Sequence, residues 1–197
     1  MRRIKHTKTE LKAQRDALAR FERYLPMLQL KKKQLQMEIQ TIEVRIREND
    51  AETSRLWEEL NRWVRLFSEP VNLENLLILR EVVTDTGNIA GVEIPILRDV
   101  VIETPPPDLW ATPTWFDDAQ ELLVRLLRLR VAHEILERQR ELIALELERT
   151  TQRVNLFEKV KIPECRENIR TIRIFLGDLQ TAAVVRGKLA KRRIGED

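Results

Sequence analysis

The sequence is short of the residues that build disulfide-linked, secreted or membrane-embedded proteins. Its single cysteine, Cys165, excludes an internal disulfide and favours a reducing compartment. The longest apolar runs, such as residues 76–79, fall far short of the roughly 20 residues that a membrane-spanning helix needs. No apolar segment follows the basic N-terminus, so no signal peptide is expected. We therefore expect a cytoplasmic chain that does not insert into a membrane.

The residue groupings of an active site or a cofactor site are also missing. His133 precedes Glu137 by four residues, but the second histidine of an H-E-x-x-H zinc motif is absent. The segment 87–91 is not followed by the Lys-Ser/Thr of a phosphate-binding loop. The basic run 188–193 contains no aromatic residues on which bases could stack. We expect no catalytic residues, no cofactor, no metal site and no nucleic-acid partner.

What the sequence does contain is the composition of long helices. Charged residues make up 34%, aromatic residues 5%, and only five glycines occur in 197 residues. The formal charge of +3 is unevenly distributed, because residues 1–35 carry +8 and residues 160–197 carry +4, which leaves −9 for the remainder. Both termini are therefore basic and the centre is acidic.

Apolar residues recur with the seven-residue step of a coiled coil in two segments. The first segment, residues 1–67, forms one long helix with a seam at Leu18, Phe21, Leu25, Leu28, Leu35, Ile39, Ile42 and Ile46. The second segment, residues 115–197, forms the other, with seam residues Leu136, Ile143, Val154, Phe157, Ile162, Ile169, Ile172 and Leu176. The predicted fold class is mainly α, a long antiparallel two-helix coiled coil with a small central β-hairpin.

Two such helices can pair within one chain or each can find a partner in another molecule. Antiparallel pairing within the chain brings Pro26 within about two turns of Pro163, where the heptad register moves by one residue and a kink is expected. It also brings the polar seam residues Asn49 and Thr53 level with His133. Intramolecular pairing is therefore favoured. The helix after about residue 175 then has no partner and projects as an overhanging basic tip.

The central segment, residues 68–114, has a different composition. Two β-branched runs flank the sequence Gly-Asn-Ile-Ala-Gly at 87–91, which predicts a hairpin with a glycine-supported loop. Pro95 places the second run at a sheet edge, and residues 104–107 form a stiff proline-rich linker. The four tryptophans, at 57, 63, 110 and 115, favour a small apolar head where the helices turn round.

These parts resemble the D subunit of the V/A-type rotary ATPases. The motif that carries the resemblance lies within residues 153–176 and consists of Arg153, Val154, Asn155, Glu158, Ile162, Pro163, Glu167, Asn168, Ile169 and Ile172. The hairpin residues Asn88, Ile89, Gly91, Val92, Ile94 and Pro95 also match the family pattern. The sequence departs from it at His6, where the family often has proline, and in residues 177–187, which lack the usual acidic and aromatic residues.

The resemblance implies a non-catalytic rotor shaft that transmits torque between a catalytic hexamer and a membrane ion-translocating ring. The implied partners are the A and B subunits around the shaft, the F subunit on its side, and the membrane-socket subunit at the hairpin end. The protein would then lie peripherally on the inner face of the membrane. The basic tip would point toward the hexamer with Arg186, Lys188, Lys191, Arg192 and Arg193. A coiled-coil structural adaptor unrelated to ATPases is the alternative interpretation.

Overall fold

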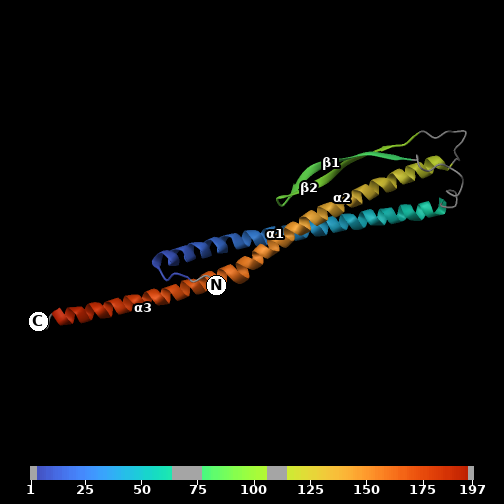
Figure 1. The fold of residues 1–197 in the computed structure, drawn as a ribbon. Coiled ribbons are helices and arrows are strands. Elements are labelled where there is room, and N and C mark those ends of the chain that lie inside the picture. Colours follow the sequence, from blue (N-terminus) through green and yellow to red (C-terminus); the bar gives the residue numbers. More distant parts are fainter. Residues whose placement is uncertain (1–3, 64–76, 106–114, 195–197) are drawn as a thin grey trace. The chain divides into compact units, whose positions relative to one another are not determined.

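A computed structural model of the chain describes residues 4–63, 77–105 and 115–194, without the side chains of residues 62, 63, 193 and 194 (Figure 1). The elements are helix α1 (Lys8–Trp63), strands β1 (Ile78–Ile89) and β2 (Val92–Glu103), helix α2 (Phe116–Asn155), the π-helical segment η2 (Leu156–Lys161) and helix α3 (Ile162–Ile194). The predicted class, mainly α with a small antiparallel hairpin, is confirmed. The predicted head falls partly on residues 68–76 and 106–114, which lie outside the described residues.

Helix α1 begins with a side-chain cap and continues through a proline. The Glu10 backbone N–H donates to Thr7 Oγ1 at 3.2 Å, which satisfies one of the free donors of the first turn. Pro26 lies inside the helix and removes one backbone hydrogen bond. The helix persists because its apolar stripe is packed along its length, which stabilises a helix more than local propensity does.

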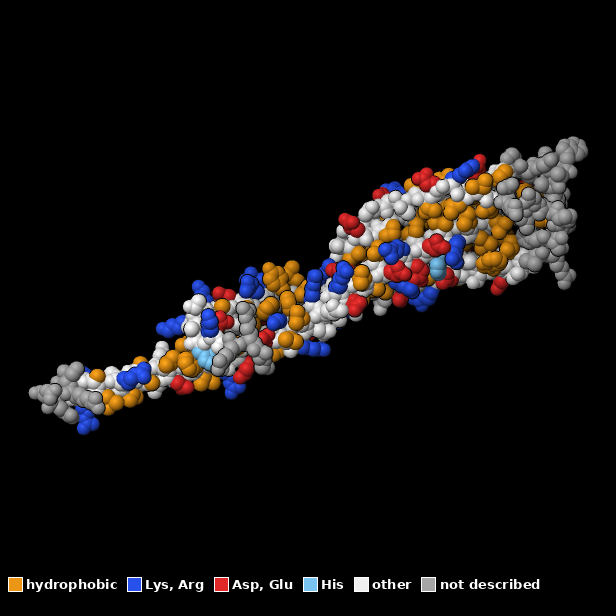
Figure 2. All heavy atoms as spheres, in the orientation of Figure 1, with side chains coloured by type: hydrophobic (Ala, Val, Ile, Leu, Met, Phe, Trp, Pro, Cys, Tyr) orange, Lys and Arg blue, Asp and Glu red, His pale blue; other side chains and the backbone are white. Residues whose placement is uncertain are grey.

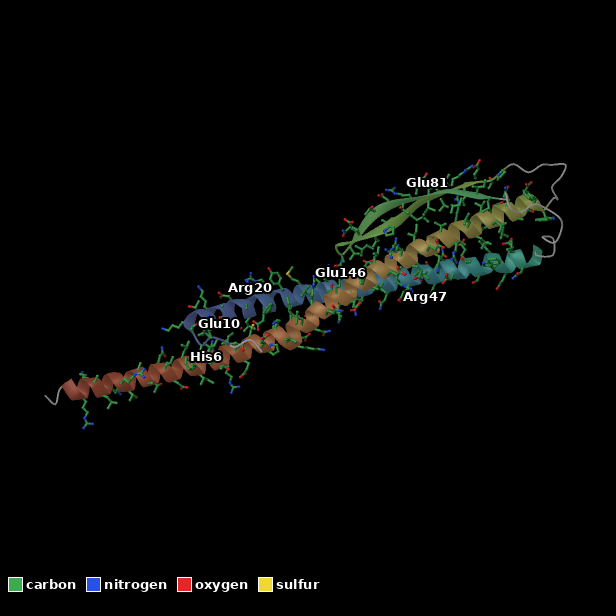
Figure 3. The ribbon with its side chains drawn as sticks, viewed as in Figure 1. His6, Glu10, Arg20, Arg47, Glu81 and Glu146 are labelled. Atoms are coloured by element: carbon green, nitrogen blue, oxygen red, sulfur yellow. The ribbon has the colours of Figure 1, made fainter. Side chains whose placement is uncertain are left out.

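The chain divides into two compact units, unit 1 (Met1–Lys32 and Arg149–Asp197) and unit 2 (Lys33–Glu148). In unit 1 the start of α1 packs antiparallel against η2 and α3. Phe21 meets Phe157 with ring centroids 4.9 Å apart. Further along α3, Asn168 Nδ2 donates to Gln14 Oε1 at 3.3 Å. Residue numbers thus rise on one helix as they fall on the other, which is the antiparallel order. The ring of His6, labelled in Figure 3, lies 4.8 Å from the ring of Phe175 of α3, centroid to centroid.

In unit 2 the remainder of α1 packs antiparallel against α2. One buried cluster contains Leu56 and Leu60 of α1 with Leu122 and Leu126 of α2. A second cluster contains Leu35, Ile42 and Ile46 with Ile143 of α2 and Ile94 of β2. Full burial of each aliphatic side chain contributes about 1.5–3 kcal/mol, so these clusters account for much of the pairing energy.

The hairpin turns through two residues with positive φ. Ala90 has φ 52° and Gly91 has φ 81°, which is the backbone pattern of a type I′ turn. The Asn88 Oδ1 accepts a hydrogen bond from the Gly91 N–H at 3.0 Å and fixes this turn. The strands pair from Ile89 and Val92 out to Ile78 and Glu103, with irregularities after Leu79 and Val83. The loop is therefore shorter than the expected 87–91 segment.

The hairpin folds back over the helices of unit 2, alongside α2 (Figure 1). Its turn and neighbouring residues Ile89, Ala90 and Val92 pack against the cluster that contains Ile94. Gln139 Nε2 of α2 donates to the Pro95 carbonyl at 2.5 Å. The tip of the hairpin is thus part of the packed core of unit 2.

The transition from α2 to α3 in unit 1 is made by η2. The Ile162 N–H donates to the Phe157 carbonyl, five residues back, as in a π-helix. None of the η2 residues is buried, although Val154 before it and Ile162 after it are. The expected kink next to Pro163 thus takes the form of a π-helical turn.

Candidate functional site

In the described part of the chain, no group of three or more His, Cys, Asp and Glu side chains could hold a metal ion. Cys165 lies buried in the seam of unit 1, and burial raises the pKa of its thiol, with a smaller contribution from Glu164. A thiol held protonated in this way is a poor nucleophile.

The predicted seam residues lie on the inner sides of the paired helices. Buried members are Leu35, Ile42, Ile46, Ile143, Val154, Ile162, Ile169 and Ile172. Half-buried members are Leu18, Phe21, Leu25, Leu28, Ile39, Leu136, Phe157 and Leu176. Each of these residues faces a partner helix within its own unit. The seam therefore determines which residues of the two helices lie opposite each other in unit 1 and in unit 2.

A polar layer interrupts the seam of unit 2. Asn49 Nδ2 donates to the Leu129 carbonyl at 3.3 Å, and His133 Nδ1 lies 2.9 Å from Asp50 Oδ1. Asn49 Oδ1 is buried and has no hydrogen-bond partner among the described residues. These residues border an open groove of about 570 Å³ whose other lining, including Trp57 and Leu126, is mainly apolar.

The five predicted hairpin residues have separate roles in the hairpin of unit 2. Asn88 and Gly91 form the turn, and Val92 and Ile94 pack on the helices. The Pro95 carbonyl accepts the hydrogen bond from Gln139. Gly87 allows a close approach, because a Cβ there would lie 2.4 Å from Ile96 Cδ1.

The expected basic tip is the exposed end of α3. Arg186, Lys188, Lys191 and Arg192 are exposed, and the Arg193 side chain lies outside the described residues. Val184, Val185 and Leu189 are also exposed, by 50–58%. No described helix of unit 1 packs against this stretch. None of the described helices is long and apolar enough to cross a membrane.

The heptad pattern did not single out a second group of exposed apolar residues in unit 1. Tyr24, Met27 and Leu30 of α1 are 51–69% exposed, and Leu156 and Val160 of η2 are 44% and 48% exposed. A signal was present in the sequence, since these residues recur at steps of three or four beside the seam. Figure 2 shows hydrophobic side chains gathered on unit 1 and bordered by Lys and Arg side chains.

Comparison with known proteins gives a consistent result over nearly the whole chain. A family model described as the D subunit of ATP synthase matches residues 10–192. The V-type ATP synthase D subunit of Borreliella burgdorferi is 48% identical over 191 residues, which cover 97% of this chain and 95% of the relative. The V-type ATP synthase D subunit of Chlamydia pneumoniae is 34% identical over 194 residues, covering 97% and 93%. That of Chlamydia trachomatis serovar L2 is also 34% identical, covering 97% and 96%.

Proposed function

We propose a mechanism from the premise that this chain belongs to the family of ATP synthase D subunits. As a member of this family, the chain is a stalk subunit of a V-type rotary ATPase and a component of a larger complex. The adaptor alternative loses its support, because the family match extends over nearly the whole chain. The chain acts as the rotor shaft and transmits torque between the catalytic hexamer and the membrane ring.

The paired helices suit the transmission of torque. Two helices joined along an apolar seam resist twisting better than one helix, and seam side chains such as Ile143 and Ile172 are fully buried. The polar layer at Asn49 and His133 contributes to register in the way that buried polar residues do in coiled coils. The chain itself is non-catalytic, and ATP turnover resides in partner subunits.

The partners follow from the same premise. The A and B subunits form the hexamer that surrounds the basic tip at the end of α3, where Lys188 and Lys191 are exposed. The F subunit binds the side of the shaft, and the membrane-socket subunit binds at the hairpin end. The chain is thereby held peripherally at the inner face of the membrane. The observation that carries this proposal is the family match over residues 10–192.

Rotation of the shaft is measured directly in the assembled complex. Asp99 of β2 is exposed and can be replaced by cysteine for coupling to a bead, whereas Cys165 is buried and the wild-type chain serves as the unlabelled control. With the hexamer fixed to a surface, ATP is expected to drive stepwise, one-directional rotation of the bead. A bead that stays still while the same complexes hydrolyse ATP would contradict the proposal.

A further inference from the structure

Unit 1 exposes an apolar surface that its two paired helices do not cover. We call it the Tyr24 surface and define it by Tyr24 and Met27 of α1 and by Leu156 and Val160 of η2. Their side chains are between 44% and 63% exposed. Large apolar side chains grouped in this way on a rigid element typically mark a binding surface.

The two halves of this surface lie on one side of the helix pair. Tyr24 and Met27 each precede a seam residue of α1 by one position, and on the opposing helix Leu156 precedes Phe157 by one position, with Val160 four residues further along. In an antiparallel pair, the positions just before the seam on both helices flank the same side. The positions just after the seam flank the other side, where Arg166 Nη2 contacts Glu22 Oε1 at 2.8 Å.

The π-helical turn keeps this side open. η2 has no buried residue, so Leu156 and Val160 project outward between the buried residues Val154 and Ile162. In unit 2, by contrast, the hairpin covers residues that precede the seam of α2. There Gln139 donates to the Pro95 carbonyl, and Leu142 packs against the buried cluster that includes Ile94 of the hairpin. No described element covers the corresponding positions of unit 1.

The rim of the surface is basic. On α1, Arg20 lies on the same side as Tyr24, one turn before it. On the opposing helix, Arg149 and Arg153 lie on the same side as Leu156, two turns and one turn before it. None of these three arginines forms an ion pair with a described residue. Figure 3 labels Arg20 on α1. Positions 20, 24, 27 and 31 of α1 and positions 149, 153, 156 and 160 of the opposing helix include no acidic residue, whereas Glu22 and Glu158 lie on the other side.

We propose that the Tyr24 surface docks an acidic polypeptide segment with an apolar face, supplied by another component of the complex. This inference rests on the proposed function, because it takes the occupant from the rotary assembly. An acidic segment complements the arginine rim, whereas a second copy of this chain would bring two basic rims together. The apolar side chains span only about two helical turns before the arginines begin, which suits a short peptide segment better than a bilayer surface.

Photocrosslinking in the assembled complex tests the occupant. Benzoylphenylalanine placed at Met27 or at Leu156 of the full chain is expected to crosslink, in the purified complex, to a peptide with net negative charge and apolar side chains. The same probe at Glu158, an exposed residue just after the seam, serves as the control and is expected not to capture that peptide. Crosslinking of Met27 to a second copy of this chain, to a basic peptide or to nothing would overturn the proposal.

Substitutions test the energetic contribution. Met27→Ser with Leu156→Ser is expected to weaken binding of the crosslinked partner about tenfold, because two exposed apolar side chains lose their burial. Arg20→Glu with Arg153→Glu is expected to weaken it by a similar factor, and more strongly at low salt. Met37→Ser is the matched control, since Met37 is 65% exposed and Met27 is 63% exposed.

The outcomes separate this inference from the proposed function. If the wild-type chain does not assemble with the other components of the ATPase, the proposed function fails. If it assembles and both double variants assemble with unchanged affinity, only the docking proposal fails. Binding of the full chain to vesicles of anionic phospholipid, abolished by Met27→Ser with Leu156→Ser, would also overturn it in favour of a membrane contact.

Discussion

Asn49 is the residue at which the seam of unit 2 departs most clearly from an apolar interface. Its Oδ1 is buried without a partner among the described residues, and its Nδ2 makes one long hydrogen bond of 3.3 Å. A buried polar atom that has lost its water without gaining a partner destabilises the folded state. Coiled coils retain such residues because they oppose alternative registers.

Replacement of Asn49 by leucine is therefore expected to stabilise the chain. The free energy of unfolding should rise by about 1 kcal/mol, since the orphaned oxygen is removed and apolar area is buried. Thermal melting followed by circular dichroism measures this change. Asn61→Leu, at an exposed position of the same helix, should leave the melting temperature nearly unchanged. A lower melting temperature for Asn49→Leu would show that the amide is satisfied in solution.

The hairpin contains a carboxylate whose pKa reports a local ion pair. Arg98 donates two hydrogen bonds to Asp85 Oδ2, and these, with the Thr86 N–H and the arginine charge, lower the pKa of Asp85. A group with a lowered folded pKa contributes stability above its unfolded pKa, and this contribution is lost as pH falls through the folded value.

The Asp85 pair predicts a specific change in titration. In Arg98→Met the pKa of Asp85 should rise toward its ordinary value, while the Thr86 N–H still holds it slightly low. Carbon-detected NMR titration of the carboxyl group measures both values. An unchanged Asp85 pKa in Arg98→Met would mean that the ion pair does not persist in solution.

At the scale of elements, the helices and the hairpin could be predicted from periodicity, because seven-residue and two-residue patterns reflect which side chains face a core. The sequence shows the one-residue offset of the heptad register at Pro163, but it does not show which backbone conformation accommodates that offset. A register offset can be absorbed by a kink, by local unwinding or by a π-helical turn, and the heptad pattern is the same for all three. The outward position of Leu156 and Val160 follows from η2 and so was missed.

The hairpin shows a similar limit. Glycines at 87 and 91 suggested one loop, but the strand continues through Gly87 to Ile89. At Gly87 the absence of a side chain leaves room for Ile96, which lies where a Cβ of residue 87 would be. Of these two glycines, only Gly91 has a positive φ. A sequence pattern does not distinguish these two uses of glycine, nor does it show that the hairpin folds back onto Ile143.

The π-helical turn predicts how the chain responds to deletions. In a Pro163→Ala background, deletion of Lys159 from η2 should restore continuous α-helical register and leave stability within about 1 kcal/mol of the background. Deletion of Arg138, an exposed residue of α2 outside η2, should cost several kcal/mol, because the following seam residues rotate away from their partners. Melting curves compare the two. Equal losses would show that η2 does not absorb the offset.

At the scale of the whole molecule, the end of α3 is the part of the described chain that depends most on partners. Beyond Leu176, every described residue up to Arg192 except Ala182 is exposed. Isolated helices of this length are marginal in water, and Gly187 costs about 1 kcal/mol relative to alanine. The basic side chains therefore gain a fixed geometry mainly when other subunits surround them.

Truncation after residue 183 tests this dependence. The melting temperature of the isolated chain and its binding to the F subunit should be unchanged, because no described contact in the seam is removed. The torque of the assembled complex should fall, and its dependence on salt should weaken because the charges of the tip are removed. A full-length variant with Arg186, Lys188, Lys191, Arg192 and Arg193 changed to glutamine separates charge from length. Torque equal to wild type for both variants at low salt would contradict a role for the tip.

The exposed end of α3 also determines how the free chain is degraded. Trypsin cleaves after Lys and Arg in segments that can open locally, and Arg186, Lys188, Lys191 and Arg192 all lie in exposed helix that no described helix covers. The basic residues elsewhere in α1 and α3 of unit 1 lie in helices that are paired along the seam, which opposes local opening. Chains that have not been incorporated into a complex would thus be trimmed first at this end, and a shortened C-terminus would distinguish orphan subunits from those taken from working enzymes.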